Sequence, residues 1–459
     1  MNRVTKRTWL MGLFLLILVG GMVVFLVEYA VSARQWVAFS GSPHLYNGGN
    51  IGCGTITDRS GEMLLDITED RTYSPDKTTR LSTLHWLGDR NGHISATAIS
   101  HYAAELSGFD LVNGIYDADG TGGEAALTLS ARVQNVAYNA MNGRNGTVAV
   151  YNYKTGEILC AVTTPTFDPD NVPDIAGDTS GKYEGVYLNR FTQSSYIPGS
   201  IYKVVTTAAA LECVPDILER KFDCNAKIEY GTETVTCGIV HGRQTLMAAL
   251  ANSCNCAFAQ IAELVGRKNM QKYVEQFGVA DSVSFDGVTT AGGSYDISAA
   301  APVSFAWSCI GQYTDLINPC SFMTFMGAIA GGGSGAQPYV VKQVEAGEKL
   351  TYQAQTSKTD RIMSEETAKV LQDFMRNNVQ NNYGAWNFPG LSVCAKSGTS
   401  QLGGDEISNA MFAGFVTDEA YPLAFIVVVE NGGYGSAACV PILSRVLAEC
   451  KNVMDAEAN

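Results

Sequence analysis

The sequence predicts an α/β protein whose central sheet is assembled from both ends of the chain, behind a membrane anchor. Two strand-like runs precede a mostly helical block and three follow it, at residues 147–153, 157–163, 391–399, 410–416 and 423–430. Strands on both sides of a helical block imply one sheet that joins them. An uncharged apolar run at residues 8–27 has about the 20 residues that a bilayer-spanning helix requires.

The charges beside the apolar run predict the orientation of the anchor. Basic residues precede the run and Glu28 follows it. The positive-inside rule then makes residues 1–31 a cytoplasmic tip and anchor, with the rest of the chain outside. A cleaved signal peptide is the alternative, because Ala30-Val31-Ser32-Ala33 resembles a small-x-small cleavage site. The apolar stretch of a signal peptide is usually only ~7–15 residues long, which favours an uncleaved, single-pass anchor in the cell membrane.

Length and composition bound the rest of the chain. With 459 residues and 46% hydrophobic content, it is long enough for two or three folded domains. The net charge of −14 argues against nucleic acid and anionic membrane surfaces as partners. Residues 32–127 are rich in turn-forming residues, with short strand-like pieces at 50–56 and 63–68, and predict a small β-rich outer module. Residues 128–459 are expected to form the main domain.

The elements of this main domain have local signals of their own. Ser130 is a candidate N-cap for a helix at residues 131–141. Two more helices are predicted at residues 245–251 and 256–265, the second closed by Gly266 as a C-cap. A closing helix packed on the sheet is predicted from apolar residues at helical spacing, which are Ile442, Leu443, Val446, Leu447 and Val453.

The twelve cysteines raise the question of disulfides, which persist in oxidising compartments. Cys224 and Cys237 flank a predicted hairpin of residues 227–230 and 234–236, and we expect them to form a disulfide; two free thiols are the alternative. The Cys254-x-Cys256 pair is a weak metal signal, and the five histidines are scattered without ligand spacing. We therefore expect no structural or catalytic metal, and no cofactor.

A reactive serine is predicted at Ser200, in the segment Ser200-Ile201-Tyr202-Lys203. It follows Pro198-Gly199 and opens an uncharged run, residues 204–211, which indicates the start of a buried helix. A serine hydroxyl is a poor nucleophile at neutral pH and needs a base within hydrogen-bond reach. Positions three apart share one face of a helix, so Lys203, if neutral, can serve as that base. The two residues are a candidate Ser-Lys pair.

Two further motifs follow in order, Ser253-Cys254-Asn255 and Lys396-Ser397-Gly398-Thr399. The first lies in a tight connection between two predicted helices, from which side chains can project into a cleft. The second lies on a predicted edge strand, to which an extended peptide can add as another strand. The same letters recur at Ser74-Pro75-Asp76-Lys77, which opens no apolar helix, and at Lys154-Thr155-Gly156, a predicted hairpin turn.

The three motifs S-x-x-K, S-x-N and K-[ST]-G in this order are similar to the signature of penicillin-binding proteins and class A β-lactamases. From about residue 128 onward, the chain resembles the transpeptidase domain of monofunctional (class B) penicillin-binding proteins, in their compact penicillin-binding protein A form. Further similar segments are Thr155-Gly156-Glu157-Ile158, Pro165, Asp168-Pro169, Asn189-Arg190, Gly311-Gln312, Asn318-Pro319, residues 409–414 and, in the outer module, residues 56–61.

The resemblance implies a serine β-lactamase-like fold, with a central antiparallel sheet flanked by helices, and a peptidoglycan D,D-transpeptidase with carboxypeptidase side activity. Ser200 would attack a stem peptide that ends in D-Ala-D-Ala, and β-lactams would acylate the same residue. The catalytic residues would be Ser200, Lys203, Ser253 and Asn255. The substrate-binding residues would be Lys396, Ser397, Gly398 and Thr399, and all of these but Gly398 would bind the terminal carboxylate. The implied partners are a membrane-embedded glycan polymerase and divisome or elongasome proteins.

The sequence departs from the family pattern at three positions. Cys254 stands where Asp is common, Ser397 replaces the usual Thr, and Tyr313 stands where Gly is frequent; none of these changes removes a group that the chemistry needs. A β-lactamase is one alternative, but no water-positioning Glu-x-x-Leu-Asn segment follows Asn255. A penicillin-sensing receptor or an inactive scaffold is another. The seven residues before the apolar run offer no signalling domain, and the intact motifs argue against inactivity.

Overall fold

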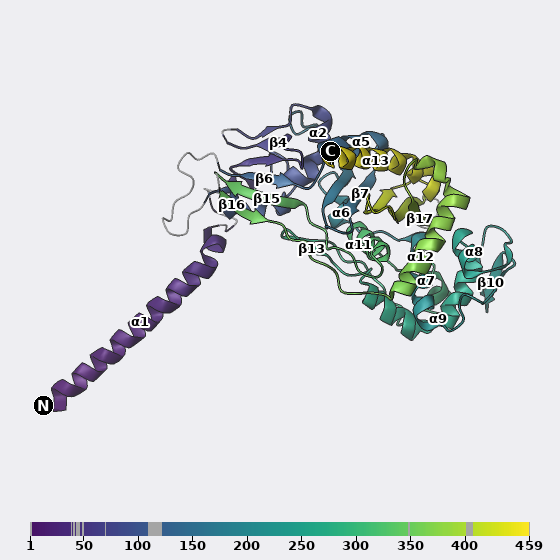
Figure 1. Ribbon diagram of the computed structural model, residues 1–459, viewed down its shortest axis with the longest axis horizontal. Helices are drawn as coiled ribbons and strands as arrows, with labels where there is room; N and C mark the ends of the chain where they lie inside the picture. The colour runs from purple at the N-terminus through teal and green to yellow at the C-terminus, as the bar shows by residue number, and fades with distance from the viewer. Residues whose placement is uncertain are drawn as a thin grey trace.

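The protein consists of a long N-terminal helix, a β-rich part and a larger α/β part (Figure 1). The computed structural model describes residues 2–37, 39, 42, 46–47, 50–68, 70–108, 122–347, 349–400 and 407–458. Part of the predicted outer module, residues 109–121 among them, lies outside the described residues.

Helix α1 (Asn2–Val37) projects from the body as a rod, and the β-rich part lies at its base (Figure 1). Between Arg3 and Ala33 the helix is long and apolar enough to cross a membrane. This confirms the predicted apolar helix and extends it at both ends. Helices α8 and α9 lie at the opposite end of the body from α1 (Figure 1).

The β-rich part is built on a six-stranded sheet with the order β16-β15-β6-β3-β4-β5. Its strands are β3 (Thr55–Thr57), β4 (Met63–Asp66), β5 (Thr72–Tyr73), β6 (Glu124–Leu127), β15 (Val341–Ala346) and β16 (Lys349–Gln353), beside a separate pair, β1 (Tyr46–Asn47) and β2 (Asn50–Ile51). The β15–β16 hairpin comes from far along the chain and pairs with β6. The predicted domain boundary after residue 127 therefore assigns β3 to β6 to the outer module and β15 and β16 of the same sheet to the main domain. The boundary remains a prediction.

The central sheet has five strands in the order β17-β18-β19-β7-β8, all antiparallel. They are β7 (Gly146–Asn152), β8 (Ile158–Thr164), β17 (Val393–Ser400), β18 (Asn409–Val416) and β19 (Leu423–Val429). Strand β19 pairs with β7, with Leu423 opposite Asn152, so the two ends of the main domain meet in one sheet. This confirms the prediction that one sheet joins strands from both sides of the helical block. Strand β17 forms one edge of this sheet.

Helices cover both faces of this sheet. Helices α5 (Ala131–Met141) and α13 (Gly435–Glu457) pack on one face, and α11 (Pro319–Ala330) and α12 (Glu365–Asn378) on the other. Successive side chains of a strand point to opposite faces, and Met411 and Phe412 of β18 accordingly enter the two separate cores. The predicted helices at 131–141 and at the end of the chain are confirmed, and the Ser130 side chain caps α5 as expected.

The helical block contains α7 (Lys203–Cys213), α8 (Leu246–Ala251) and α9 (Asn255–Phe277), with four short strands between α7 and α8. Gly266 interrupts α9 with φ 73° and ψ 155°, but the chain resumes its helix and continues to Phe277. The prediction that the helix ends at Gly266 is therefore wrong: Gly266 breaks the helix locally, and α9 ends at Phe277. The strands are β9 (Phe222–Cys224), β10 (Lys227–Tyr230), β11 (Glu233–Thr236) and β12 (Gly242–Gln244).

The remaining described elements connect these layers. They are α2 (Lys77–Leu87), α3 (Thr97–Ser100), α4 (Ala103–Leu106), α6 (Arg190–Gln193), α10 (Pro302–Ser308), β13 (Ser284–Phe285) and β14 (Val288–Thr289). The recurring letters at residues 74–77 and 154–156 are called the first and second duplicate motifs. Helix α2 begins at Lys77 of the first one, where the Asp76 side chain caps it, and it packs against α5. The second duplicate motif forms the β7–β8 turn, with Gly156 at φ 95° as expected.

The predicted disulfide is wrong. All twelve cysteines are free, which matches the alternative of two free thiols at Cys224 and Cys237. The hairpin between them is present as β10 and β11. The two thiols do not form an exclusive pair, because the side chains of His241 and Cys254 converge on the same point.

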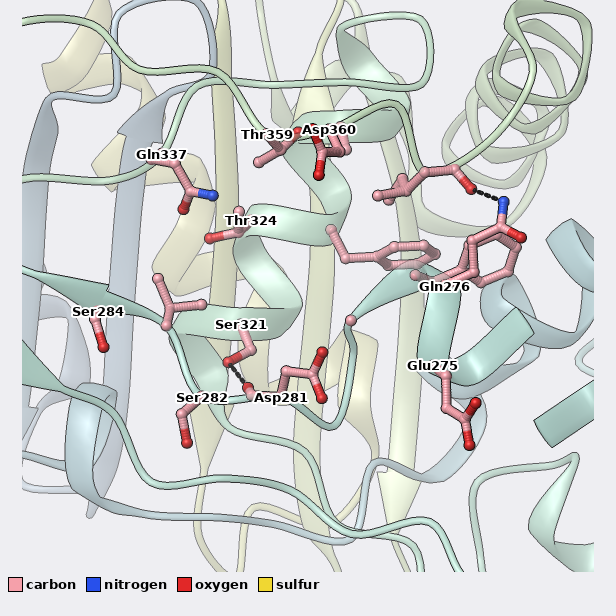
Figure 2. Close-up of a pocket in the computed structure, with 16 residues that line it drawn as sticks. Glu275, Gln276, Asp281, Ser282, Ser284, Ser321, Thr324, Gln337, Thr359 and Asp360 are labelled. Carbon is pink, nitrogen blue, oxygen red and sulfur yellow. Dashed lines mark hydrogen bonds between the residues drawn. The ribbon is translucent and has the colours of Figure 1, made fainter. Parts of the chain in front are cut away.

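A cavity of about 370 Å³ lies between the end of α9 and helix α11 (Figure 2). Polar side chains such as Glu275, Thr324 and Gln337 line it, and the Ser321 hydroxyl donates a hydrogen bond to the Asp281 carbonyl oxygen at its wall. Its lining contains no residue of the three motifs. The predicted site residues therefore lie elsewhere.

Candidate active site

Ser200 lies on a short 3₁₀ turn, Gly199–Tyr202, that leads directly into α7. The turn is pressed against β17: a Cβ atom on Gly199 would lie 2.6 Å from the carbonyl oxygen of Thr399. Gly199 also has φ 56°, a conformation that glycine adopts without steric cost. Glycine at this position therefore lets the serine reach the edge strand. Ser200 itself is only partly buried, so the nucleophile is not sealed from solvent.

Lys203 lies beside Ser200, as the three-residue spacing predicts. Its Nζ atom is 3.0 Å from Ser200 Oγ. The same Nζ lies 2.6 Å from the carbonyl oxygen of Ser253 and 2.7 Å from Oδ1 of Asn255. A neutral amine has two N–H groups and one lone pair. The two carbonyl oxygens can take the two N–H groups, which leaves the lone pair for the Ser200 hydroxyl proton.

The second motif reaches Lys203 from the connection between α8 and α9. Ser253 has φ 51°, in the left-handed region, and Asn255 opens α9. This backbone turn presents both the carbonyl and the hydroxyl group of Ser253 to Lys203, the hydroxyl at 3.1 Å. The Asn255 amide is oriented from its other side, because its Nδ2 donates to the carbonyl oxygen of Thr236, 2.9 Å away.

Lys396 of the third motif completes the group. Its Nζ donates to Ser253 Oγ at 3.1 Å and to the Ser397 carbonyl oxygen at 2.8 Å. Lys396 and Lys203 are both 0% exposed. The structure therefore brings together the lysines and the Ser253 hydroxyl of three segments that lie far apart in the sequence.

Burial shifts the protonation of both lysines. Desolvation lowers the pKa of Lys203 well below its usual range, and the positive charge of Lys396 lowers it further. Desolvation also lowers the pKa of Lys396, to about 7. Both shifts disfavour the charged amine. The site thus favours the uncharged form of Lys203, which a Ser-Lys nucleophile requires.

The edge strand β17 carries the two hydroxyl groups of the third motif, those of Ser397 and Thr399. Ser397 and Thr399 are partly buried, whereas Gly398 is buried, and a Cβ there would lie 2.8 Å from the Pro198 carbonyl oxygen. The Thr399 hydroxyl accepts a hydrogen bond from the backbone N–H of Gly435, 3.2 Å away. The three predicted motifs therefore meet at the β17 edge: the Ser200 turn packs against Gly398 and Thr399, and Ser253 contacts both lysines.

Sequence reasoning missed Tyr383. Its hydroxyl lies 3.0 Å from Ser397 Oγ and accepts a hydrogen bond from the Ser397 backbone N–H at 3.1 Å. It comes from a turn, Val379–Tyr383, that follows α12. A single tyrosine in the polar segment at residues 380–384 carries no pattern that could have marked it.

Comparison with protein families identifies the family of this chain. The family described as "Penicillin binding protein transpeptidase domain" matches residues 146–448, more than half of the chain. The chain belongs to this family. The match runs from the first strand of the central sheet, β7, into the closing helix α13, and it includes all three motifs.

Curated relatives of this chain include proteins of two kinds. The chain is 26% identical over 362 residues to "Peptidoglycan D,D-transpeptidase PbpA" of Mycolicibacterium smegmatis, covering 72% of this chain and 73% of that protein. It is 27% identical over 347 residues to "Stage V sporulation protein D" of Bacillus subtilis, covering 70% of this chain and 52% of that protein. The chain thus spans about half the length of the sporulation protein.

Solved structures of transpeptidases share the fold. A ceftriaxone acyl-enzyme complex of penicillin-binding protein A from M. tuberculosis matches with a TM-score of 0.74 at 22% identity, covering 86% of this chain and 97% of that one. The D,D-transpeptidase domain of a peptidoglycan glycosyltransferase from Eggerthella lenta matches with a TM-score of 0.75 at 25% identity, covering 86% and 98%. The predicted fold class is therefore confirmed, with the central antiparallel sheet flanked by helices.

Proposed function

We propose that this protein is a peptidoglycan D,D-transpeptidase that cross-links stem peptides through an acyl-enzyme on Ser200, and that β-lactams acylate the same serine. The observation that carries the proposal is the 3.0 Å contact between Lys203 Nζ and Ser200 Oγ at a site where burial favours the neutral amine. Membership of the transpeptidase family and relatives named D,D-transpeptidases support it.

The acylation step uses the Ser200–Lys203 pair. Ser200 Oγ attacks the carbonyl carbon of the penultimate D-Ala while its proton passes to Lys203 Nζ. The developing oxyanion accepts hydrogen bonds from the backbone N–H groups of Ser200 and Thr399, which the approach of the 3₁₀ turn to β17 brings near each other. Loss of one such donor typically costs ~10²–10³ in rate.

The leaving group and the acceptor use Ser253. Its hydroxyl lies within hydrogen-bond distance of both lysine Nζ atoms, so it can pass a proton from Lys203 to the amine of the departing D-Ala. The acceptor amine of a neighbouring stem peptide then attacks the acyl-enzyme carbonyl. Ser200 regains its proton, and a new peptide bond has replaced the one that was broken.

The third motif would hold the substrate's terminal carboxylate. Lys396 is fully buried and bonded to Ser253, so it supplies positive charge from behind the strand. We propose that the partly buried hydroxyl groups of Ser397 and Thr399 contact the carboxylate itself. The free edge of β17 suits an extended stem peptide, which can lie along it as an added strand.

The same proposal covers location and partners. Residues 1–31 would cross the membrane once with the N-terminus in the cytoplasm, residues 32–127 would form the outer module, and residues 128–459 the transpeptidase domain. The length and apolar character of α1 support the anchor. The partners would be a membrane-embedded glycan polymerase and divisome or elongasome proteins, because a transpeptidase needs newly made glycan strands as its substrate.

Covalent labelling by a fluorescent penicillin tests the function. We expect the full chain in detergent to be labelled, and Ser200→Ala and Lys203→Ala to lose labelling while they remain folded. The control is Ser298→Ala, which removes an exposed hydroxyl bonded only within its own turn at Asp296, and it should label normally. Labelling that survives Ser200→Ala would refute the nucleophile.

A further inference from the structure

Three thiols and one imidazole converge directly behind the second motif. The ligand atoms of Cys224, Cys237, His241 and Cys254 all lie within 4.8 Å of one another. Cys237 Sγ is 3.9 Å from Cys254 Sγ, and Nδ1 of His241 is 3.4 Å from the Sγ atoms of both Cys224 and Cys237. The four residues come from separate places in the chain: the end of β9, the residue after β11, the residue before β12 and the N-cap of α9.

The three shortest of these spacings are close to the edges of a tetrahedron around a metal ion. Zn–S bonds of about 2.3 Å and Zn–N bonds of about 2.0–2.1 Å give S···S edges of about 3.8 Å and S···N edges of about 3.6 Å. The observed 3.9 Å and 3.4 Å lie close to both values. A disulfide would instead need two of the sulfur atoms at a covalent distance of about 2.0 Å.

We propose that Cys224, Cys237, His241 and Cys254 bind one structural zinc ion. Three sulfur donors and one imidazole form a soft, tetrahedral donor set that suits zinc, and four protein ligands leave no open position for a reacting water. Binding forms three Zn–S bonds and one Zn–N bond, and the three thiol protons pass to solvent. The proposal departs from the expectation of no metal, which rested on spacing along the sequence.

The surroundings of the cluster fit a bound metal in two respects. The backbone N–H of Ala257 donates to Cys254 Sγ at 3.4 Å, the kind of outer contact that orients a metal thiolate. The strands that carry the other ligands form only two-stranded pairs, β10–β11 and β9–β12. A two-stranded hairpin is marginally stable in water, so the cross-link that a zinc ion supplies would stabilise this small region.

The zinc ion would also position the catalytic asparagine, an inference that rests on the proposed function. Cys237 follows Thr236, and Cys254 precedes Asn255. The Thr236 carbonyl oxygen accepts a hydrogen bond from the Asn255 amide nitrogen, and Asn255 Oδ1 accepts one from Lys203 Nζ. A metal that holds Cys237 and Cys254 therefore fixes both ends of the hydrogen bond that orients Asn255. Asn255 is the catalytic residue, and the metal ligands are positioning residues.

Metal content is the first test. The full chain, purified in detergent from zinc-supplemented cells, should contain about one zinc per chain by mass spectrometry of the elements. Cys224→Ser, Cys237→Ser and His241→Asn should lose most of it. The matched control is Cys213→Ser, a partly buried thiol at the end of α7, which should keep it. Zinc-free wild-type chain, or equal zinc in all variants, would overturn the proposal, and so would a Cys224–Cys237 disulfide in the purified chain.

Cobalt substitution removes the objection that a variant loses metal because it fails to fold. Wild-type chain stripped with a chelator and given Co²⁺ alone should show the intense visible bands of a tetrahedral ion and a thiolate-to-cobalt charge-transfer band. Cys213→Ser should give the same spectrum. The weak bands of octahedral cobalt in wild type would mean that the four side chains do not bind a metal together.

Acylation of the stripped chain tests the positioning role separately. Removal of zinc should slow penicillin acylation by about tenfold or more, the usual size of an outer-contact effect, and Zn²⁺ alone should restore it. Unchanged acylation after complete loss of zinc would overturn the positioning role. Because zinc content is measured without any substrate, a failed metal site and a failed transpeptidase give different results.

Discussion

The Nζ atoms of Lys203 and Lys396 both lie 3.1 Å from one oxygen, the Oγ of Ser253. Both side chains are fully buried, and two ammonium groups cannot both remain charged there without a large desolvation cost. The pKa of Lys203 lies well below its usual range, and that of Lys396 lies at about 7. The Ser253 hydroxyl thus lies between a lysine whose neutral form burial favours and a lysine that can still be charged near neutral pH.

The rate of penicillin acylation should therefore have a bell-shaped pH dependence. A lysine with a lowered pKa is neutral above that pKa, so acidification protonates Lys203 and removes the base. Above about pH 7, Lys396 loses the charge that attracts the carboxylate. Second-order acylation rates across the pH range would show both limbs. The control is Lys154→Gln in the duplicate motif of the β7–β8 turn, which should leave the profile unchanged. A rate that stays constant on acidification contradicts a neutral Lys203.

Tyr383→Phe should slow acylation with little loss of stability. The change removes the hydroxyl that contacts Ser397, while the ring keeps its packing on Phe412 at 5.1 Å between centroids. A net hydrogen bond of about 0.5–1.5 kcal/mol predicts a fall of roughly two- to tenfold in the acylation rate. Tyr421→Phe also removes a bonded hydroxyl, but one that contacts Asp455 and Lys451 of α13, and it should have no effect on the rate. Equal rates for both variants would mean that Tyr383 does not position Ser397.

Gly199→Ala should impair both folding and acylation. The new Cβ would meet the Thr399 carbonyl oxygen at 2.6 Å and push the Ser200 turn away from β17. A displacement of about 1 Å at a reacting group can cost ~10² in rate. Gly181→Ala separates this contact from backbone strain, because Gly181 also has positive φ, 76°, but open space around it. Gly181→Ala should lose about 1 kcal/mol of unfolding free energy and keep its acylation rate. A Gly199→Ala enzyme that acylates normally would show that this close approach is not needed.

The sequence predicted the parts of the site that depend on short-range patterns. The Ser200–Lys203 spacing works because both residues share one helical turn, and the alternating cores of β18 follow from strand geometry. The cysteine cluster could not be predicted in this way, since twelve residues separate Cys224 from Cys237 and the fold of the intervening strands decides which side chains meet. The same limit explains the wrong disulfide prediction, because spacing alone does not say whether a third thiol lies nearby.

Tyr313 shows that a departure from a family pattern can still keep its geometry. It stands where the family often has Gly, and the structure gives it φ 74°, a conformation that favours glycine. The preceding Gly311 is fixed more tightly, because a Cβ there would lie 2.2 Å from the Gly199 carbonyl oxygen. The contact with the Ser200 turn therefore fixes the backbone of this segment. In the sequence, this contact is visible only as a preference for glycine.

Arg190→Met should be strongly destabilising, because Arg190 holds a carboxylate at the end of the central sheet. Its guanidinium contacts both carboxylate oxygens of Glu430, at 2.8 Å and 3.3 Å, and is only 5% exposed. Removal of one partner from such a pair costs about 3–5 kcal/mol when the other charge remains buried. Since the Glu430 side chain is 22% exposed, we expect about 3 kcal/mol by urea unfolding of the full chain.

Two further variants show whether the unpaired charge is the cause. Glu430→Gln added to Arg190→Met should recover part of the loss, because an amide costs less to leave without its partner than a carboxylate does. Arg90→Met breaks a pair with Asp170 in which both side chains are well exposed, 41% and 37%, and should cost at most about 1 kcal/mol. If Arg190→Met cost no more than Arg90→Met, solvent and the Tyr196 hydroxyl, which donates to Glu430 Oε1 at 2.8 Å, would be enough to stabilise Glu430. The pair would then contribute nothing to the contact between α6 and the central sheet.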